Sequence, residues 1–192
     1  MELNQILNQR RSIRQFKELP VVKDDIIEIL KAGIKAPSAG NLQPWRFIIT
    51  SNQKQIDKAV DTTYLGADME GERNQGWIRK AKFLIIACID CKDTGKKYGP
   101  DHKKSAIQDV AAAVENMVLK TVDLGLATCW ISGFRENELK DVFDVPNNVE
   151  ILAFLPIGYN DDYQSDPSKK DLSSVLFEDC YGKKASLDET GL

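Results

Sequence analysis

Three arginines and a serine form a compact set of hydrogen-bond donors near the start of the chain: Arg10, Arg11, Ser12 and Arg14. A guanidinium group is always charged and presents a planar fork of N–H donors, which suits a phosphate better than a point charge does. If the segment is helical at its start, Arg10 and Arg14 lie four residues apart and share a face. The stretch therefore indicates a phosphate site. The alternative is a solvated basic cap at the C-terminal end of a first helix, where the helix dipole favours positive charge.

A second candidate stretch has the sequence APSAGNLQPWRF and spans residues 36–47. At its centre, Gly40 permits a close approach of the backbone or a positive φ angle. Ser38, Asn41 and Gln43 supply hydrogen-bond donors and acceptors. Such a loop either binds a ligand or simply connects a helix to a strand. Because the arginines lie upstream of it, we favour the ligand site.

The other motifs that could carry chemistry are weaker. Cys88 and Cys91 have C-x-x-C spacing, but no second pair follows at the spacing of a zinc site, so a thiol-redox pair is a minor alternative. His102 is the only histidine and has no partner pattern for a catalytic triad, so it is predicted to be a surface residue. No G-x-G-x-x-G motif, Walker motif or cluster of metal ligands is found in the sequence. Neither a Rossmann dinucleotide site nor a metal site is therefore expected.

Length and charge limit the class of protein. The chain has 192 residues, which favours one domain with a substantial core. Its net charge of -3 argues against nucleic-acid binding, and a basic stretch on an acidic chain points to a small anionic ligand. No apolar run approaches the roughly 18 residues of a membrane span, and the N-terminal sequence lacks the apolar region of a signal peptide. With four cysteines, these features predict a protein of the reducing cytoplasm.

The hydrophobic pattern predicts the elements that position these residues. The predicted helices are residues 3–11, 24–36, 53–64, 105–123 and 136–143, and the predicted strands are residues 45–50, 83–89, 127–131 and 150–157. The helix 105–123 is apolar or small on most of its circumference, so it should be buried on more than one side. Gly125 is well placed to cap its C-terminal end.

Two segments lack a clear period. Residues 65–77 contain three glycines, which fits a mobile flap or a pair of short helices. Tyr64 and Trp77 flank this segment and are more typical of packing than of ligand contact. The tail is polar from residue 160 onward, yet residues 172–177 include Leu172, Val175, Leu176 and Phe177, which need a surface to pack on.

Three stretches together resemble the nitroreductase family of FMN-dependent flavoproteins. They are RRSIRQF at 10–16, APSAGNLQPWRF at 36–47 and VPNNVEILAFLPIGY at 145–159, and their order and spacing match over nearly the whole chain. The resemblance implies an α+β fold, with a central, mainly antiparallel sheet flanked by helices and a long central helix at a dimer interface. It also implies a single FMN-binding domain over residues 1–192, whose tail, 160–192, packs on the partner subunit of a homodimer.

The resemblance assigns the cofactor's phosphate end and its ring edge to the N-terminal arginines. Arg10 and Ser12 match the positions that bind the FMN phosphate, and Arg11 matches a neighbouring contact. Arg14 matches the basic residue directed at the N1/O2 edge of the flavin. A fixed cation there stabilises the negative charge that reduction places on the ring.

The resemblance also assigns residues elsewhere in the chain. A loop that the partner subunit lays against the isoalloxazine matches Pro37, Ser38, Ala39 and Asn41. Ser132 and Gly133 match the position whose backbone N–H points at flavin N5. A late basic residue on the phosphate matches Lys169 or Lys170, with Lys169 preferred.

The sequence departs from the family pattern in three places. Ala39 stands where a second serine is common, and Ser132 stands where an acidic residue often precedes the N5 glycine. Residues 65–80, which shape the substrate mouth in such enzymes, match nothing that can be aligned. Cofactor binding is therefore better supported by the sequence than the identity of the substrate.

The expected function is an FMN-dependent oxidoreductase. NADH or NADPH would reduce the flavin at N5 and leave, and an oxidised small-molecule acceptor such as a nitroaromatic or a quinone would then be reduced in the same pocket, a ping-pong mechanism. No side-chain nucleophile is needed, because the flavin carries the chemistry. The alternative is a non-catalytic flavin-binding or sensing protein on the same fold.

Overall fold

The structure is a computed structural model, and it describes residues 1–66, 68, 70, 73–99, 102–160, 165 and 167–185. The chain divides into two compact units, Met1–Asp162 and Tyr163–Leu192. The first unit holds a four-stranded sheet. In the second, a single turn of 3-10 helix, η4 (Leu172–Ser174), is followed by a ring contact between Phe177 and Tyr181, whose centroids lie 4.8 Å apart.

The sheet of the first unit is antiparallel throughout and has the strand order β1-β2-β4-β3. The strands are β1 (Trp45–Thr50), β2 (Phe83–Asp90), β3 (Ala127–Thr128) and β4 (Val149–Gly158). In the register, Ile86 of β2 lies opposite Ile48 on one side and Phe154 on the other. The six central residues of β2 are all buried, which explains its unbroken apolar sequence. The predicted antiparallel sheet is confirmed.

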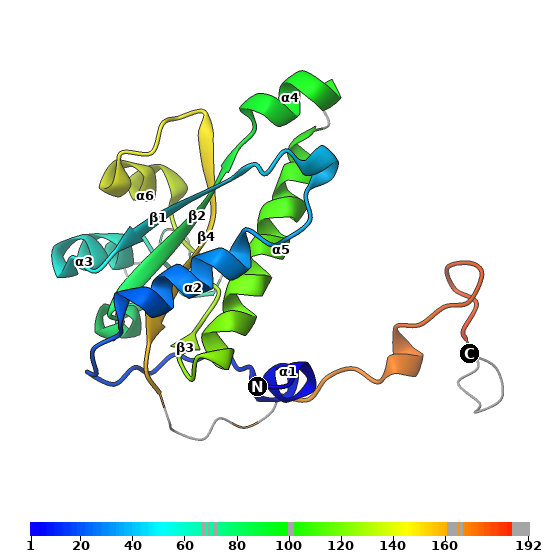
Figure 1. The fold of residues 1–192 in the computed structure, drawn as a ribbon, viewed down its shortest axis with the longest axis horizontal. Helices are drawn as coiled ribbons and strands as arrows, with labels where there is room; N and C mark the ends of the chain where they lie inside the picture. The colour runs from blue at the N-terminus through cyan, green and yellow to red at the C-terminus, as the bar shows by residue number, and fades with distance from the viewer. Residues whose placement is uncertain are drawn as a thin grey trace. The chain divides into compact units, whose positions relative to one another are not determined.

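Helices cover both faces of the sheet (Figure 1). They are α1 (Leu3–Gln9), α2 (Lys23–Gly33), α3 (Gln53–Asp61), α4 (Lys92–Tyr98), α5 (His102–Asp123) and α6 (Glu136–Phe143), with short 3-10 turns η1 (Ala39–Asn41) and η2 (Gly76–Lys80). Neighbouring residues of β2 face opposite sides. Ile85 packs with α2 and α5, whereas Ile86 packs with α3 and α6. The fold is therefore α+β with two apolar cores, one on each face.

The helix α5 is the long central helix expected from the sequence. Ala113 and Met117 on it are fully buried, and α2 approaches it so closely that a Cβ atom on Gly33 would lie 2.8 Å from Met117 Cγ. Gly125 ends the helix with a φ of +71°, its N–H donating to the Val122 carbonyl. The N–H of Leu126 donates to the Thr121 carbonyl, which completes a Schellman cap. The predicted role of Gly125 is confirmed.

Several predicted boundaries need correction. The first helix ends at Gln9, and Arg10 adopts an extended conformation with ψ of 125°. Arg10 and Arg14 therefore do not share a helical face, and that prediction is wrong. The second helix ends at Gly33 rather than near residue 36, and the regular part of β3 stops at Thr128.

The region between β2 and α5 also differs from the prediction. The helix α4 was not predicted. Gly95 and five charged or polar neighbours leave this short helix without a clear hydrophobic period. His102 opens α5 and is half-buried, and its Nδ1 atom contacts the Gly99 carbonyl. It is thus less exposed than predicted. Over the described residues, none of the helices has the length and apolar character that crossing a bilayer requires.

Candidate functional site

A cavity of about 320 Å³ lies where three segments of the first unit meet. We call it the first cavity. Arg14 comes from the N-terminal connector, residues 64–66 follow α3, and residues 129–133 continue the chain beyond β3. Gln75 completes the lining. The fold thus brings Arg14 to the same cavity as Ser132 and Gly133, which lie far from it in the sequence.

Backbone bonds and one buried ring position the arginine segment. The Ile13 N–H donates to the Thr128 carbonyl at 2.9 Å, and the Lys17 N–H donates to the Tyr159 carbonyl at 2.8 Å. Phe16 is buried between them, and a Cβ on Gly158 would lie 2.8 Å from its ring. Residues 13–17 therefore run along the edge of the sheet, and Arg14 stays exposed at the first cavity.

A buried thiol shows that the predicted phosphate residues gather in one place. Cys129 lines the first cavity and is almost fully buried. Burial raises the pKa of this thiol, while the guanidinium of Arg14, the hydroxyl of Ser12 and the guanidinium of Arg10 each act to lower that pKa. All three side chains are thus close enough to Cys129 to influence its charge. Cys129 was not predicted from the sequence, where its only signal is its position three residues before Ser132.

The side chain of Arg11 is directed instead at the C-terminal end of α1. Arg11 donates from Nη1 to the carbonyls of Asn8 and Arg10, at 2.8 and 2.7 Å. These contacts cap the C-terminal end of α1. Arg11 is therefore the basic helix cap that the sequence offered as the alternative to a phosphate site. Its predicted contact with a cofactor stays a prediction.

Gly133 is held through its carbonyl. That oxygen accepts from the Tyr64 N–H at 3.1 Å and from Gln75 Nε2 at 3.4 Å, and Gln75 Nε2 also donates to the Tyr64 carbonyl at 3.2 Å. No hydrogen bond within the described residues uses the Gly133 N–H. A backbone donor at a cavity wall, with its own carbonyl fixed, is available to an acceptor atom of a ligand.

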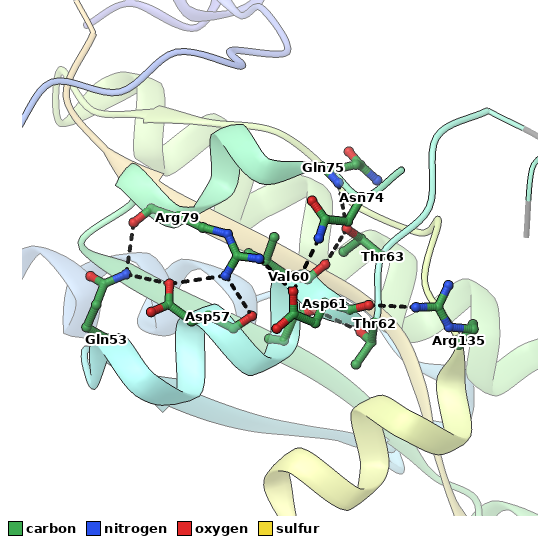
Figure 2. A network of polar contacts seen from close by, with 11 residues as sticks. Gln53, Asp57, Val60, Asp61, Thr62, Thr63, Asn74, Gln75, Arg79 and Arg135 are labelled. Atoms are coloured by element: carbon green, nitrogen blue, oxygen red, sulfur yellow. Dashed lines mark hydrogen bonds and ion pairs between the residues drawn. The ribbon is translucent and has the colours of Figure 1, made fainter. Parts of the chain in front are cut away.

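A polar network supports this wall from behind (Figure 2). Arg79 forms ion pairs with Asp57 at 3.4 Å and Asp61 at 2.6 Å, and Asn74 donates to the same Asp61 oxygen at 3.2 Å. Arg135 donates to the Asp61 carbonyl at 2.6 Å. These five residues, which we call the brace, tie α3 and η2 to Arg135, two residues after Gly133. None of them was predicted, because charges far apart in sequence meet only in the folded chain.

The brace should contribute measurably to stability. Replacing Arg79 by Gln removes both ion pairs and the bond from Nη1 to the Asp57 carbonyl, which is 3.1 Å long. Because the guanidinium is partly exposed, we expect the free energy of unfolding to fall by only about 1 kcal/mol. Urea unfolding would measure the loss. Lys80→Gln is the matched control: it removes one charge from the next residue, which forms no ion pair within the described chain. An equal loss in both variants would contradict the role of the brace.

The loop predicted to face the flavin, residues 37–41, is held by hydrogen bonds to other parts of its own chain. Ser38 Oγ accepts from the Gln43 N–H, and the Ala39 N–H donates to both carboxylate oxygens of Asp109, all at 3.1 Å. The predicted tight turn at Gly40 is present, with a φ of +56°, and Asn41 is also left-handed at +57°. Asp109, an unpredicted residue of α5, thus anchors the loop.

Within one chain, this loop does not line the first cavity. The loop is anchored at Asp109 near the start of α5, whereas β3 follows the other end of that helix, beyond Asp123 (Figure 1). The helix between these two residues is about 21 Å long at 1.5 Å per residue. Pro37, Ser38, Ala39 and Asn41 therefore do not join Arg14 and Gly133 in a site built from a single copy.

Two further sets of predicted residues can be placed. Lys169 and Lys170 are exposed in the second unit. Cys88 packs in the core beside α3 and α6, while Cys91 packs against the core on the other face of the sheet. Burial raises the pKa of Cys88 to about 11 and also raises that of Cys91. Two protonated thiols on opposite faces are poorly suited to dithiol chemistry.

A four-stranded antiparallel sheet covered on both faces, with a long buried helix beside it, defines an α+β protein. The sequence profile of the nitroreductase family matches residues 7–159, and the chain belongs to that family. A curated protein of Archaeoglobus fulgidus, whose name pairs NADH dehydrogenase with NAD(P)H nitroreductase, is 30% identical over 165 residues, which cover 84% of this chain and 87% of the relative. The resemblance found in the sequence is thus confirmed.

Solved structures agree with this assignment. A nitroreductase family protein from Clostridium novyi NT has a TM-score of 0.72 and 26% identity, with 96% of this chain and 97% of that one covered. An FMN-dependent nitroreductase from Clostridium difficile R20291 has a TM-score of 0.73 and 23% identity, with 90% and 96% covered. Both have the same fold as this chain.

Proposed function

We propose that this protein is an FMN-dependent oxidoreductase that carries electrons from NADH or NADPH to a small oxidised acceptor, such as a nitroaromatic compound or a quinone. The observation that carries the proposal is the first cavity, where Arg14 and the Gly133 backbone meet although they lie far apart in sequence. Membership of the nitroreductase family and the FMN-dependent neighbour from C. difficile support the choice of cofactor.

The residues at the first cavity fit FMN by their chemistry. Arg10 and Ser12 would hold the phosphate, since they supply a charged fork and a hydroxyl donor beside Cys129. Arg14 would face the ring edge that gains negative charge, and the Gly133 N–H would serve the N5 position. FMN, when bound, would supply the hydride chemistry that no side chain here can supply. Lys169 or Lys170 would add a further phosphate contact.

A second copy of the chain would complete this site. The loop at residues 37–41 does not line the cavity of its own chain, so we propose a homodimer in which each copy offers its loop to the other. Exposed apolar side chains support a partner surface: Leu3, Leu7 and Ile34 on the first unit are 61%, 50% and 50% exposed. In the tail, Leu172 and Val175 are more than half exposed, which suits packing on the partner.

The dinucleotide and the acceptor would use the first cavity in turn. The Gly133 N–H and Arg14 serve either half of the reaction, because both groups face the same position. NADH or NADPH would leave as the oxidised nucleotide before the acceptor enters, which gives a ping-pong mechanism. The protein would act in the cytoplasm, as its sequence predicts.

The purified protein should be yellow and should release FMN, not FAD, on denaturation. Mixing it anaerobically with NADH or NADPH should bleach the bound flavin, and a nitroaromatic or quinone should restore the colour. Chromatography and absorbance record both results. Cys88→Ala and Cys91→Ala serve as controls and should keep full activity. Release of FAD, or protein that takes up no FMN, would contradict the cofactor. Bound FMN that neither nucleotide bleaches would support a flavin-binding protein instead of an enzyme.

A further inference from the structure

A second cavity, of about 360 Å³, adjoins the first on the other side of Arg14. The lining residues that the structure describes are polar, basic or aromatic, and none of these is acidic. They are Arg14, Gln15, Phe16, Lys17, Trp77, Lys80 and Asn160. The family resemblance assigns no role to this cavity, and of its residues only Arg14 belongs to the proposed flavin site.

The charges at the second cavity are positive. Within the described residues, neither Arg14 nor Lys80 forms an ion pair with a carboxylate, although many exposed lysines of this chain do so. Lys17 brings a third cationic group to the rim. Two cationic groups at one cavity, here Arg14 and Lys80, raise the local potential, and that potential attracts an anion.

The remaining wall is apolar and fixed in place. The ring of Trp77 packs against Phe16, with centroids 5.9 Å apart and planes tilted by 34°. Asn160 Nδ2 donates to the Gln15 carbonyl at 2.7 Å, which holds the rim of the cavity to the sheet edge. A half-buried aromatic ring at a cavity wall, next to cationic groups, suits a ligand with a flat apolar body and one charged end.

We propose that the second cavity binds an oxyanion, a carboxylate or a phosphate, carried on a small aromatic body. The oxyanion would lie between Arg14 and Lys80, and the body would rest on Trp77. The acceptor or the nucleotide of the proposed reaction could carry such a group. Because Arg14 lines both cavities, an anion in the second would also reduce the positive charge that Arg14 presents to the first. Only this coupling rests on the proposed function; the binding does not.

Binding can be followed by the indole N–H signals of the full-length protein in NMR titrations. Trp77 lines the second cavity and Trp130 lines the first, so the two signals distinguish the sites, and Trp77→Phe assigns the first signal. Benzoate and phenyl phosphate should shift the Trp77 signal, whereas benzyl alcohol, which is neutral, should not. A stronger response to benzoate would indicate a carboxylate ligand, and a stronger response to phenyl phosphate would indicate a phosphorylated one.

Lys80 provides the decisive variants, since it is exposed and its replacement should leave the fold intact. Lys80→Gln should weaken anion binding about threefold and Lys80→Glu about tenfold, as expected for a partly solvated ion pair. Lys58→Gln, an equally exposed lysine on α3, is the matched control and should bind as the parent does. Equal binding by all of these proteins, or an equal response to benzyl alcohol, would overturn the proposal.

The coupling is tested on the flavin-loaded protein. A saturating anion should lower the flavin midpoint potential in the parent, and Arg14→Ala should abolish that shift. An unchanged potential would overturn the coupling. If the protein proves to hold no flavin but still binds the anions in a Lys80-dependent manner, the proposed function fails and the anion site stands. If flavin is present and no anion binds, the anion site fails alone.

Discussion

A mixture of two inactive variants should recover oxidoreductase activity. One variant, Arg10→Ala, lacks a phosphate ligand of the proposed site. The other, Ala39→Trp, places a bulky ring on the half-exposed loop and leaves the bonds from the Ala39 N–H to Asp109 in place. If each site takes its arginines from one copy and its loop from the other, a mixed dimer holds one intact site and one doubly altered site. Random pairing should therefore restore about a quarter of the parent activity.

The experiment has a matched control within the chain. Arg10→Ala mixed with Arg14→Ala alters the same contribution in both copies, so each site of a mixed dimer stays defective and the activity should not exceed the mean of the two variants. The variants can be produced together in one cell. The mixed dimer, isolated with two different tags, should then have about half of the parent activity, because one of its two sites is intact. Recovery in the control as well, or no recovery in the test mixture, would contradict a site shared between copies.

The fold follows from patterns that act over short stretches of sequence. The buried run FLIIACI became most of the inner strand β2, and the alternation of turns and apolar segments marked the four strands, whose antiparallel arrangement was implied by the family resemblance. The long helix and its glycine cap were also predicted, because Gly125 needs a left-handed conformation that few other residues adopt. Errors in the bounds of helices and strands, as at Gln9, arise because competing local contacts decide whether the last one or two residues belong to the element.

The candidate site could be predicted only in part. Arg14 lies in one of the stretches that carry the family resemblance, and that resemblance implied Ser132 and Gly133. The structure brings all three residues to one cavity. Cys129 and Gln75 carry no motif. Gln75 is held at the cavity by bonds to the Tyr64 and Gly133 carbonyls, and such contacts join residues that are distant in sequence.

The contacts that anchor the loop and the brace could not be predicted from the sequence for the same reason. Asp109 looks like an ordinary polar position of a long helix, yet it is buried and binds the Ala39 N–H across 70 residues of sequence. Asp61 and Arg79 form one ion pair of 2.6 Å across 18 residues. Charge pairs of this kind follow the fold rather than a local period, so a single sequence does not reveal them.

Replacing Arg14 by Ala should lower the midpoint potential of the bound flavin by some tens of millivolts, whereas Arg10→Ala should chiefly weaken FMN binding. The phosphate charge is the same in both redox states, so a phosphate ligand stabilises both states about equally. A cation at the ring edge stabilises the anionic reduced state more. A hydrogen bond to a charged group contributes roughly 1.5–3 kcal/mol. For a two-electron couple, about 30 mV corresponds to about 1.4 kcal/mol.

Redox titration of the parent and both variants, together with FMN dissociation constants, would measure this division of roles. The two arginines lie near the same buried Cys129 thiol, so a general change in charge at the site would affect both variants alike. Lys58→Ala is a useful further control, since Lys58 is exposed on α3 and lines neither cavity. Its loss should leave the potential within a few millivolts of the parent's value. If Arg10→Ala shifts the potential as far as Arg14→Ala does, the arginine stretch acts as one undivided phosphate clamp, and the assignment of Arg14 to the ring edge is wrong.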